Sequence, residues 1–175
     1  MGFALSSMQV SSAAFGQHQA IPAKHTGEGE DISPDLAWQG APEGTQGFAV
    51  ICHDPDAPLV KEGSYGFVHW VLYNLPGDMT SLEENTTQGT LGMSDFGKPG
   101  YGGPCPPEGH GAHRYQFTVF AVKEAALPVQ AERGRPLVDF SEEEAERIWT
   151  SYGLPTFEYD PETGPFECLP LTRGG

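Results

Sequence analysis

Three short apolar runs lie in the middle of the chain, and each of them predicts a β-strand. The run from Phe48 to Cys52 follows a glycine and ends at a turn-rich segment. The run from Phe67 to Leu75 carries bulky side chains on both faces and stops before Pro76, which is typical of a central strand. In the run from His113 to Val122, every second side chain should share one face, Tyr115 included. The chain is therefore predicted to be mainly β.

A helical pattern is found near the C-terminus. Ser141 is followed at the capping-box distance by Glu144, and acidic residues suit the positive end of a helix dipole. Gly153 and Pro155 would end the helix. The apolar positions that recur between these limits at helical spacing are Ala145, Ile148, Trp149 and Tyr152. We therefore expect a peripheral helix in this part of the chain.

The length and composition of the chain indicate one domain, residues 1–175, with many turns. A chain of 175 residues suits a single hydrophobic core, and no repeat or linker divides it. The 23 Gly and 16 Pro residues stand between apolar runs that a disordered chain would lack. The formal net charge of -15, with only nine Lys and Arg, repels phosphate backbones and anionic lipids. Nucleic acids and membrane surfaces are therefore not expected as partners.

The spacing of the cysteines gives no sign of a disulfide framework or of a zinc site. Cys52, Cys105 and Cys168 form no Cys-x-x-Cys pair, and one cysteine would remain if two were bonded. Cys105 is therefore expected to be a passive, small apolar residue. No apolar stretch approaches the roughly 20 residues that a membrane-spanning helix needs, so no integral membrane association is expected. These features favour a reducing, cytoplasmic location.

Polar residues that could carry chemistry lie on or beside the predicted strands. His69 and His113 lie within strands, whereas Asp54 and Asp56 lie in the turn that leaves the first strand. Taken alone, His69 would more often be a core histidine that bonds a backbone carbonyl. No histidine matches a zinc pattern, and we expect no metal and no cofactor. The remaining histidines are expected at the protein surface, namely His18, His25, His53 and His110.

Four short motifs follow one another in the middle of the chain. They are DPDAP at 54–58, HWVLYNLP at 69–76, YGGPCPP at 101–107 and HRY at 113–115. In this order and approximate spacing they resemble the phosphatidylethanolamine-binding protein family, in its bacterial, Raf-kinase-inhibitor-like branch. The resemblance is strongest over residues 8–122.

The resemblance implies a β-sandwich-like domain with a large central sheet, a smaller flanking sheet and peripheral helices near the C-terminus. It also implies one small pocket for an anion such as phosphate or a phosphoethanolamine-like headgroup. In relatives such a protein can modulate a partner such as a kinase, and bacterial relatives form homodimers. The residues that match the pocket positions of the family are Asp54, Asp56, His69, Gly103, Pro104, His113 and Tyr115.

The chemistry of these residues agrees with an anion site. Imidazole and phenol groups can donate hydrogen bonds to anion oxygens, and free N–H groups of a glycine-rich turn can form an anion nest. Asp56 is the candidate for holding an imidazole in one tautomer and favouring its protonated form. Asp54 has two open roles, because it could line the pocket or bond the backbone of its own turn.

We therefore expect a non-enzymatic binding module. The alternative is an acid-base or metal-assisted hydrolase, since two histidines, two aspartates and a tyrosine could support such chemistry. No serine lies in a nucleophile elbow, which disfavours that alternative. A third possibility is a protein that acts through its surface, as a homodimer, with a vestigial pocket.

Overall fold

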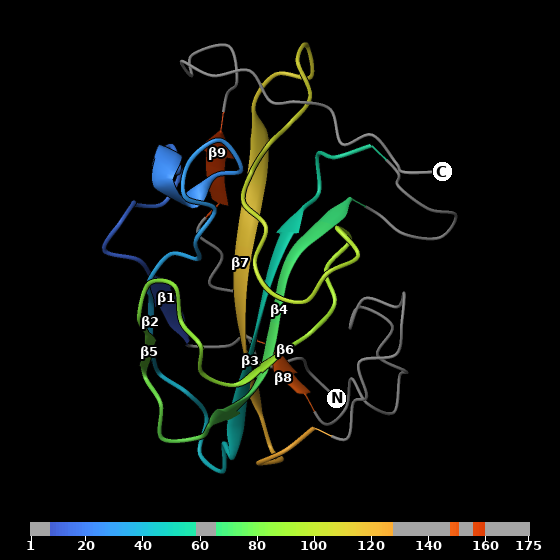
Figure 1. Cartoon of the computed structure of the whole chain (residues 1–175). Coiled ribbons are helices and arrows are strands. Elements are labelled where there is room, and N and C mark those ends of the chain that lie inside the picture. Colours follow the sequence, from blue (N-terminus) through green and yellow to red (C-terminus); the bar gives the residue numbers. More distant parts are fainter. Residues whose placement is uncertain (1–7, 59–65, 128–147, 151–155, 160–175) are drawn as a thin grey trace, which may run out of the picture.

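Two antiparallel β-sheets form the described part of the protein (Figure 1). The structure is a computed structural model and describes residues 8–58, 66–127, 148–150 and 156–159. The small sheet has the strand order β1-β2-β5, and the large sheet has the order β6-β4-β3-β7-β8, with β9 also paired to β7. The predicted mainly β fold with one large and one smaller sheet is confirmed.

The strands at the centre of the large sheet are long, and the others are short. The small sheet consists of β1 (Gln9–Ser11), β2 (Leu36–Gln39) and β5 (Ser81–Leu82). The large sheet consists of β3 (Gly47–Asp54), β4 (Phe67–Pro76), β6 (Thr90–Leu91), β7 (His113–Val122), β8 (Ile148–Thr150) and β9 (Thr156–Tyr159). The described residues form one helix, the 3-10 turn η1 (Ala23–His25). Over the same residues, no helix has the length and apolar character needed to cross a membrane.

The three predicted strands are confirmed as β3, β4 and β7, the centre of the large sheet. β3 pairs with β4 on one side and with β7 on the other, in both cases antiparallel. Because antiparallel neighbours run in opposite directions, the end of β3 meets the beginnings of β4 and β7. Asp54 lies opposite Phe67, and His53 lies opposite both Val68 and Gln116. This pairing brings the polar motifs of three separate segments to one end of the sheet.

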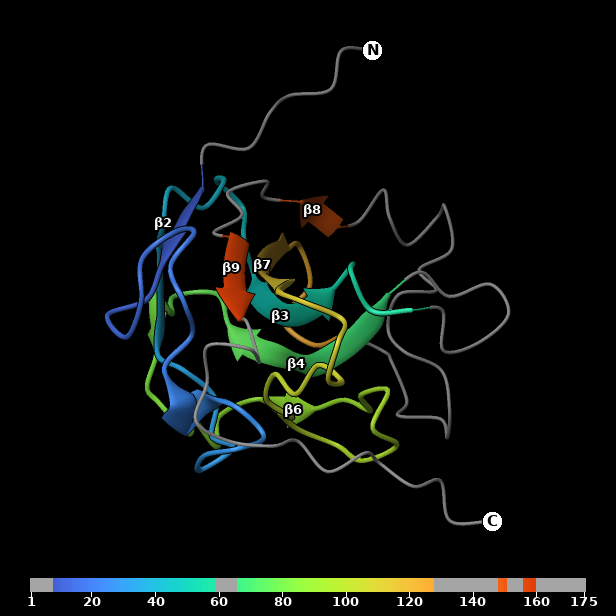
Figure 2. The same ribbon diagram turned by 90° about the horizontal axis from the view of Figure 1, so that it is seen from above.

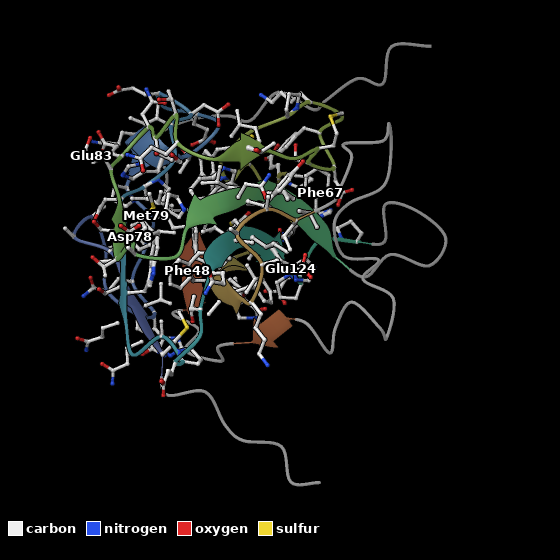
Figure 3. The ribbon with its side chains drawn as sticks, turned by 90° about the horizontal axis from the view of Figure 1, so that it is seen from below. Phe48, Phe67, Asp78, Met79, Glu83 and Glu124 are labelled. Atoms are coloured by element: carbon white, nitrogen blue, oxygen red, sulfur yellow. The ribbon has the colours of Figure 1, made fainter. Side chains whose placement is uncertain are left out.

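The main hydrophobic core lies between the two sheets. Trp38 of β2 contacts Phe48 of β3 with ring centroids 5.2 Å apart, and both residues are buried. Figure 2 shows β2 standing beside the strands of the large sheet. In Figure 3, Phe48 lies toward the interior, while Asp78, Met79 and Glu83 lie on the side that carries the small sheet. The two sheets therefore form a sandwich around one core.

β4 buries side chains on both of its faces, as its continuous apolar run predicts. Trp70 and Leu72 belong to the core between the sheets. Val71 and Tyr73 belong to a second cluster, which also contains Ala49 and Val68. A strand that is covered on both sides cannot alternate between apolar and polar residues, because neither face reaches water.

The predicted C-terminal helix is wrong where the structure describes it. Ile148–Thr150 forms the strand β8, which pairs antiparallel with Val122–Phe120 of β7. Isoleucine, tryptophan and threonine favour strands, and the edge of β7 offers unpaired backbone groups to such a segment. With so few apolar positions, helical spacing does not distinguish a helix from a strand. The rest of the predicted helix lies outside the described residues.

Candidate functional site

Asp54 is the centre of the candidate site. It ends β3, and only 2% of its surface is exposed. One carboxylate oxygen, Oδ1, accepts the backbone N–H groups of Asp56 at 2.9 Å and of Ala57 at 3.1 Å. The other oxygen, Oδ2, lies 2.8 Å from Nδ1 of His113. The predicted bond of Asp54 to its own turn is therefore present, and the same carboxylate also holds a histidine.

His113 is the buried first residue of β7. Its Nδ1 must carry a hydrogen, because the carboxylate of Asp54 can only accept a bond. Nε2 is therefore the ring nitrogen that the bond to Asp54 leaves unused. The exposed ring of His110 stacks on the ring of His113, with a centroid distance of 5.9 Å.

His69 lies at a β-bulge in β4. The register between β3 and β4 shifts here, because Cys52 pairs with Trp70 whereas His53 pairs with Val68. His69 is thus the extra residue on β4, and its carbonyl accepts the N–H of Gly102 at 2.9 Å instead of a ladder bond to β3. Bulges change the direction of side chains and are common beside functional sites.

The His69 ring is buried, and its two nitrogens have different neighbours. Nδ1 donates to the carbonyl of Gly102 at 2.8 Å, which places the titrating proton on Nε2. Nε2 lies 4.0 Å from Oδ2 of Asp54. Burial lowers the pKa of His69, and the hydrogen bond to Gly102 and the charges of Asp54 and Asp95 act in the opposite direction. The ring is therefore held in one tautomer and in an environment that favours its neutral form.

Aromatic rings surround His69. Its ring centroid lies 5.0 Å from that of Phe67, 5.2 Å from that of Phe96 and 5.1 Å from that of Tyr115. Tyr115 is fully buried, with 0% of its surface exposed. Of the predicted residues, Asp54, His69, His113 and Tyr115 are thus brought together from three strands.

Gly103 and Pro104, the predicted site wall, are tied to an earlier segment of the chain. Gly103 and Pro104 are both buried. The N–H of Gly103 donates to Oδ1 of Asp31 at 2.6 Å, and the carbonyl of Pro104 accepts the N–H of Gly27 at 2.9 Å. Since the N–H of Gly102 donates to His69, neither glycine N–H is free to form the expected anion nest, and that expectation is wrong for both residues.

Asp56 has a different partner from the one predicted. Arg114 donates to the Asp56 carboxylate from its backbone N–H at 2.8 Å, from Nε at 2.8 Å and from Nη2 at 2.6 Å. These hydrogen bonds lower the pKa of Asp56, the side-chain bond most strongly. The predicted role of Asp56 in holding an imidazole is therefore wrong, because Asp54 holds the ring of His113.

One of the four histidines expected at the surface is buried. His18 and His110 are exposed and His53 is partly exposed, but His25 has 0% of its surface exposed. The Nδ1 of His25 donates to the carbonyl of Ile32 at 2.9 Å, and its ring packs edge-on against Phe15. The polar sequence around His25 gave no sign of this burial, which the contact with Phe15 and the bond to Ile32 produce.

The cysteines also differ from the expectation. Cys52 is free and fully buried, and burial raises the pKa of its thiol well above the usual value. Cys105, beside the site wall, is disulfide-bonded, so its prediction as a passive thiol is wrong. Disulfides are typical of oxidising compartments, and this bond removes the cysteine argument for a reducing one.

The described residues of the site provide two imidazole rings and a shared carboxylate. Within the residues that the structure describes, no group of three or more His, Cys, Asp or Glu side chains is arranged to hold a metal ion. The metal-assisted form of the predicted hydrolase therefore has no support from this part of the chain. Motif spacing missed Asp31. Its carboxylate accepts the N–H of Gly103 from a position 72 residues earlier in the chain.

Comparison with known proteins places the chain among bacterial and archaeal relatives. A UPF0098 protein of Aquifex aeolicus is 45% identical over 134 residues, which cover 72% of this chain and 75% of that protein. The UPF0098 protein YbcL of Escherichia coli is 40% identical over 140 residues, covering 75% of this chain and 74% of that protein.

Solved structures show the same fold. The crystal structure of Escherichia coli YbcL, described as a new member of the mammalian PEBP family, has a TM-score of 0.71 and 32% identity, covering 89% of this chain and 99% of that one. A homologue from Chlamydia trachomatis, CT736, has a TM-score of 0.67 and 27% identity, covering 89% and 98%. The family model for phosphatidylethanolamine-binding proteins matches residues 11–150. The chain therefore belongs to the phosphatidylethanolamine-binding protein family.

Proposed function

We propose that this protein is a non-enzymatic binding module that takes a small phosphorylated or otherwise anionic ligand at the site around Asp54. One observation carries the proposal, namely that two buried histidines from different strands converge on one buried carboxylate. Membership of a family named for binding a phospholipid supports it. The proposed binding residues are Asp54, Asp56, His69, Gly103, Pro104, His113 and Tyr115.

The hydrogen-bond pattern determines what the two histidines can offer to a ligand. Each ring uses Nδ1 within the protein, His69 on the Gly102 carbonyl and His113 on Asp54. Each ring therefore offers only Nε2, which is an acceptor in the neutral form and a donor in the protonated form. An anion supplies acceptors and so requires the protonated form. We infer that anion binding and histidine protonation are coupled.

The charge balance of the site agrees with this coupling. With both rings protonated, the two histidines and Asp54 carry a net charge of +1. With both rings neutral, the same three groups carry a net charge of -1. Arg114 adds little, because Asp56 already pairs with it. The site is therefore proposed to accept an anion in mild acid and to repel it at alkaline pH.

We predict that sulfate binds more tightly as the pH falls from about 8 to about 5.5, with up to about a tenfold gain in affinity per pH unit for each proton taken up. Sulfate keeps its charge over this range, so the change reports the protein alone. Because burial lowers the pKa of His69, the gain at this ring should occur at the acidic side of the ordinary histidine range. Isothermal titration calorimetry at constant ionic strength measures the affinity. An affinity independent of pH would contradict the proposal.

Replacement of either histidine should weaken sulfate binding at the acidic end by about tenfold or more, because one charge-assisted hydrogen bond is lost. The variants are His69→Ala and His113→Ala. His18→Ala is the matched control, since His18 is exposed and has no place in the site. Unchanged affinity in both site variants would remove these histidines from the site.

Comparison of two phosphate compounds distinguishes a lipid headgroup from a free phosphate. Phosphate and phosphoethanolamine share the anionic group, but only phosphoethanolamine carries an ammonium group that can donate to a carboxylate or to a neutral Nε2. A headgroup site should therefore prefer phosphoethanolamine, most clearly at alkaline pH, where neutral Nε2 atoms accept hydrogen bonds. Equal affinity for the two compounds at every pH would instead indicate a site for the phosphate group alone.

A further inference from the structure

A single peptide group links Asp31 to the ring of His69. The carbonyl oxygen of Gly102 accepts the Nδ1 hydrogen of His69 at 2.8 Å. The N–H of Gly103, which belongs to the same amide plane, donates to Oδ1 of Asp31 at 2.6 Å. A carboxylate, an amide and an imidazole therefore form one continuous chain of hydrogen bonds.

The amide has little freedom to leave this position. A Cβ at Gly103 would lie 2.5 Å from the carbonyl oxygen of His25 and 2.7 Å from the backbone of Thr26. The hydroxyl of Tyr101 donates to the same His25 carbonyl at 2.7 Å. The peptide between Gly102 and Gly103 is thus held between the bulge of β4 and the segment that follows η1.

Asp31 has an unusual backbone conformation for this role. Its φ is +56°, in the left-handed region that non-glycine residues seldom adopt and that aspartate tolerates better than most. Its second oxygen, Oδ2, lies 3.7 Å from Nζ of Lys98, an exposed ion pair that contributes little by itself. The short bond to Gly103 is the contact through which Asp31 reaches the site.

We propose that Asp31 is a positioning residue for the anion site, acting through the Gly102-Gly103 peptide to orient His69 and to stabilise its imidazolium form. A negative charge at the N–H end of an amide polarises the group and makes its carbonyl oxygen a stronger acceptor. Histidine ligands are held in the same way by carboxylates or carbonyls behind them. The inference rests on the proposed function, because it assigns a role within that site.

Other groups also act on the His69 ring, and the test must leave them unchanged. Asp54 and Asp95 favour its charged form, and His53 disfavours it. The rings that contact it are those of Phe67, Phe96 and Tyr115. None of these side chains contacts Asp31 through a hydrogen bond or ion pair described above. Lys98, the ion-pair partner of Asp31, lies 5.7 Å from the ring centroid of Phe96 and is left unchanged in the variants.

The test compares two substitutions that separate charge from geometry. Asp31→Asn keeps an oxygen acceptor for Gly103 and suits a positive φ, but it removes the charge. Asp31→Gly keeps the backbone conformation and removes the acceptor as well. Glu30→Gln is the matched control, because it removes the same charge from the neighbouring exposed residue. All variants are full-length chains whose fold is checked by circular dichroism.

The ring nitrogens of His69 are followed by NMR across pH, without any ligand. In Asp31→Asn we expect the titration midpoint to fall by roughly half a pH unit, with Nδ1 still protonated in the neutral ring. In Asp31→Gly we expect a larger fall and a mixture of tautomers. In Glu30→Gln the midpoint should move less than in either variant. An unchanged midpoint and tautomer in both Asp31 variants would overturn the relay.

Sulfate affinity, measured on the same proteins, separates this inference from the proposed function. If wild-type protein binds sulfate, the pH profile of binding should move to lower pH in Asp31→Asn together with the His69 midpoint. If the midpoint moves but wild-type protein binds no sulfate, the relay holds and the anion function fails. If sulfate binds but neither the midpoint nor the binding profile moves, the anion function holds and the relay fails.

Discussion

Replacement of Asp54 by alanine should lower the free energy of unfolding by about 3 to 5 kcal/mol. The carboxylate is 2% exposed and accepts hydrogen bonds from His113, Asp56 and Ala57. Its removal leaves all three donors without this partner, and an unpaired buried donor costs about 1 to 3 kcal/mol. The same change also releases His113, so sulfate binding should be lost together with stability. Urea denaturation followed by circular dichroism measures the first effect, and calorimetry measures the second.

Two other aspartate variants make this result interpretable. Asp54→Asn retains an acceptor oxygen and should cost less than the alanine variant. Asp56→Ala breaks a partly exposed pair with Arg114, which is expected to contribute less than about 1 kcal/mol. Equal losses of stability for Asp54→Ala and Asp56→Ala, with the same denaturant dependence, would contradict the central role of Asp54.

Replacement of Gly103 by alanine should lower the free energy of unfolding by about 2 to 3 kcal/mol and weaken sulfate binding by tenfold or more. The new Cβ would meet backbone atoms of His25 and Thr26 at 2.5 to 2.7 Å, and backbone cannot move aside as a flexible side chain can. The loop must therefore shift, and it would carry the carbonyl of Gly102 away from His69. Denaturation and calorimetry measure both effects.

Gly16→Ala is the control for this substitution. Its added Cβ would contact only the side chain of Gln19, at 3.1 Å or more, and that side chain is exposed and can move. We expect little change in stability and none in sulfate binding. If Gly103→Ala were as well tolerated as Gly16→Ala, the tight packing between the site wall and the segment near η1 would be refuted.

Much of the fold was predictable because its central strands have strong local patterns. The runs that became β3, β4 and β7 are long, apolar and bounded by Gly and Pro. For β8 the local pattern misled, since Ile148 and Trp149 fit helical spacing and yet pair with β7. The spacing of apolar residues does not show whether a segment pairs with a distant strand. A short segment with this spacing can therefore form either a helix or a strand.

The candidate site was predictable as a set of residues but not as a network. Asp54, His69, His113 and Tyr115 were identified from motifs, and the structure brings them together. The imidazole-holding role that was predicted for Asp56 belongs to Asp54, and Asp56 instead pairs with Arg114, which follows His113 directly. Which carboxylate reaches which partner depends on the geometry of the turn after β3, and spacing along the chain carries no such information.

The amino-acid sequence by itself determined the central strands, the position of the Gly- and Pro-rich motif at 101–107 and the presence of two strand histidines near a turn with two aspartates. Only the tertiary structure decided that His69 lies at a bulge, that His25 is buried and that Asp31 reaches the site wall. The physical reason is the range of the interactions. Strand formation follows from neighbouring residues, whereas a register shift and a hydrogen bond across 72 residues exist only once distant segments have packed.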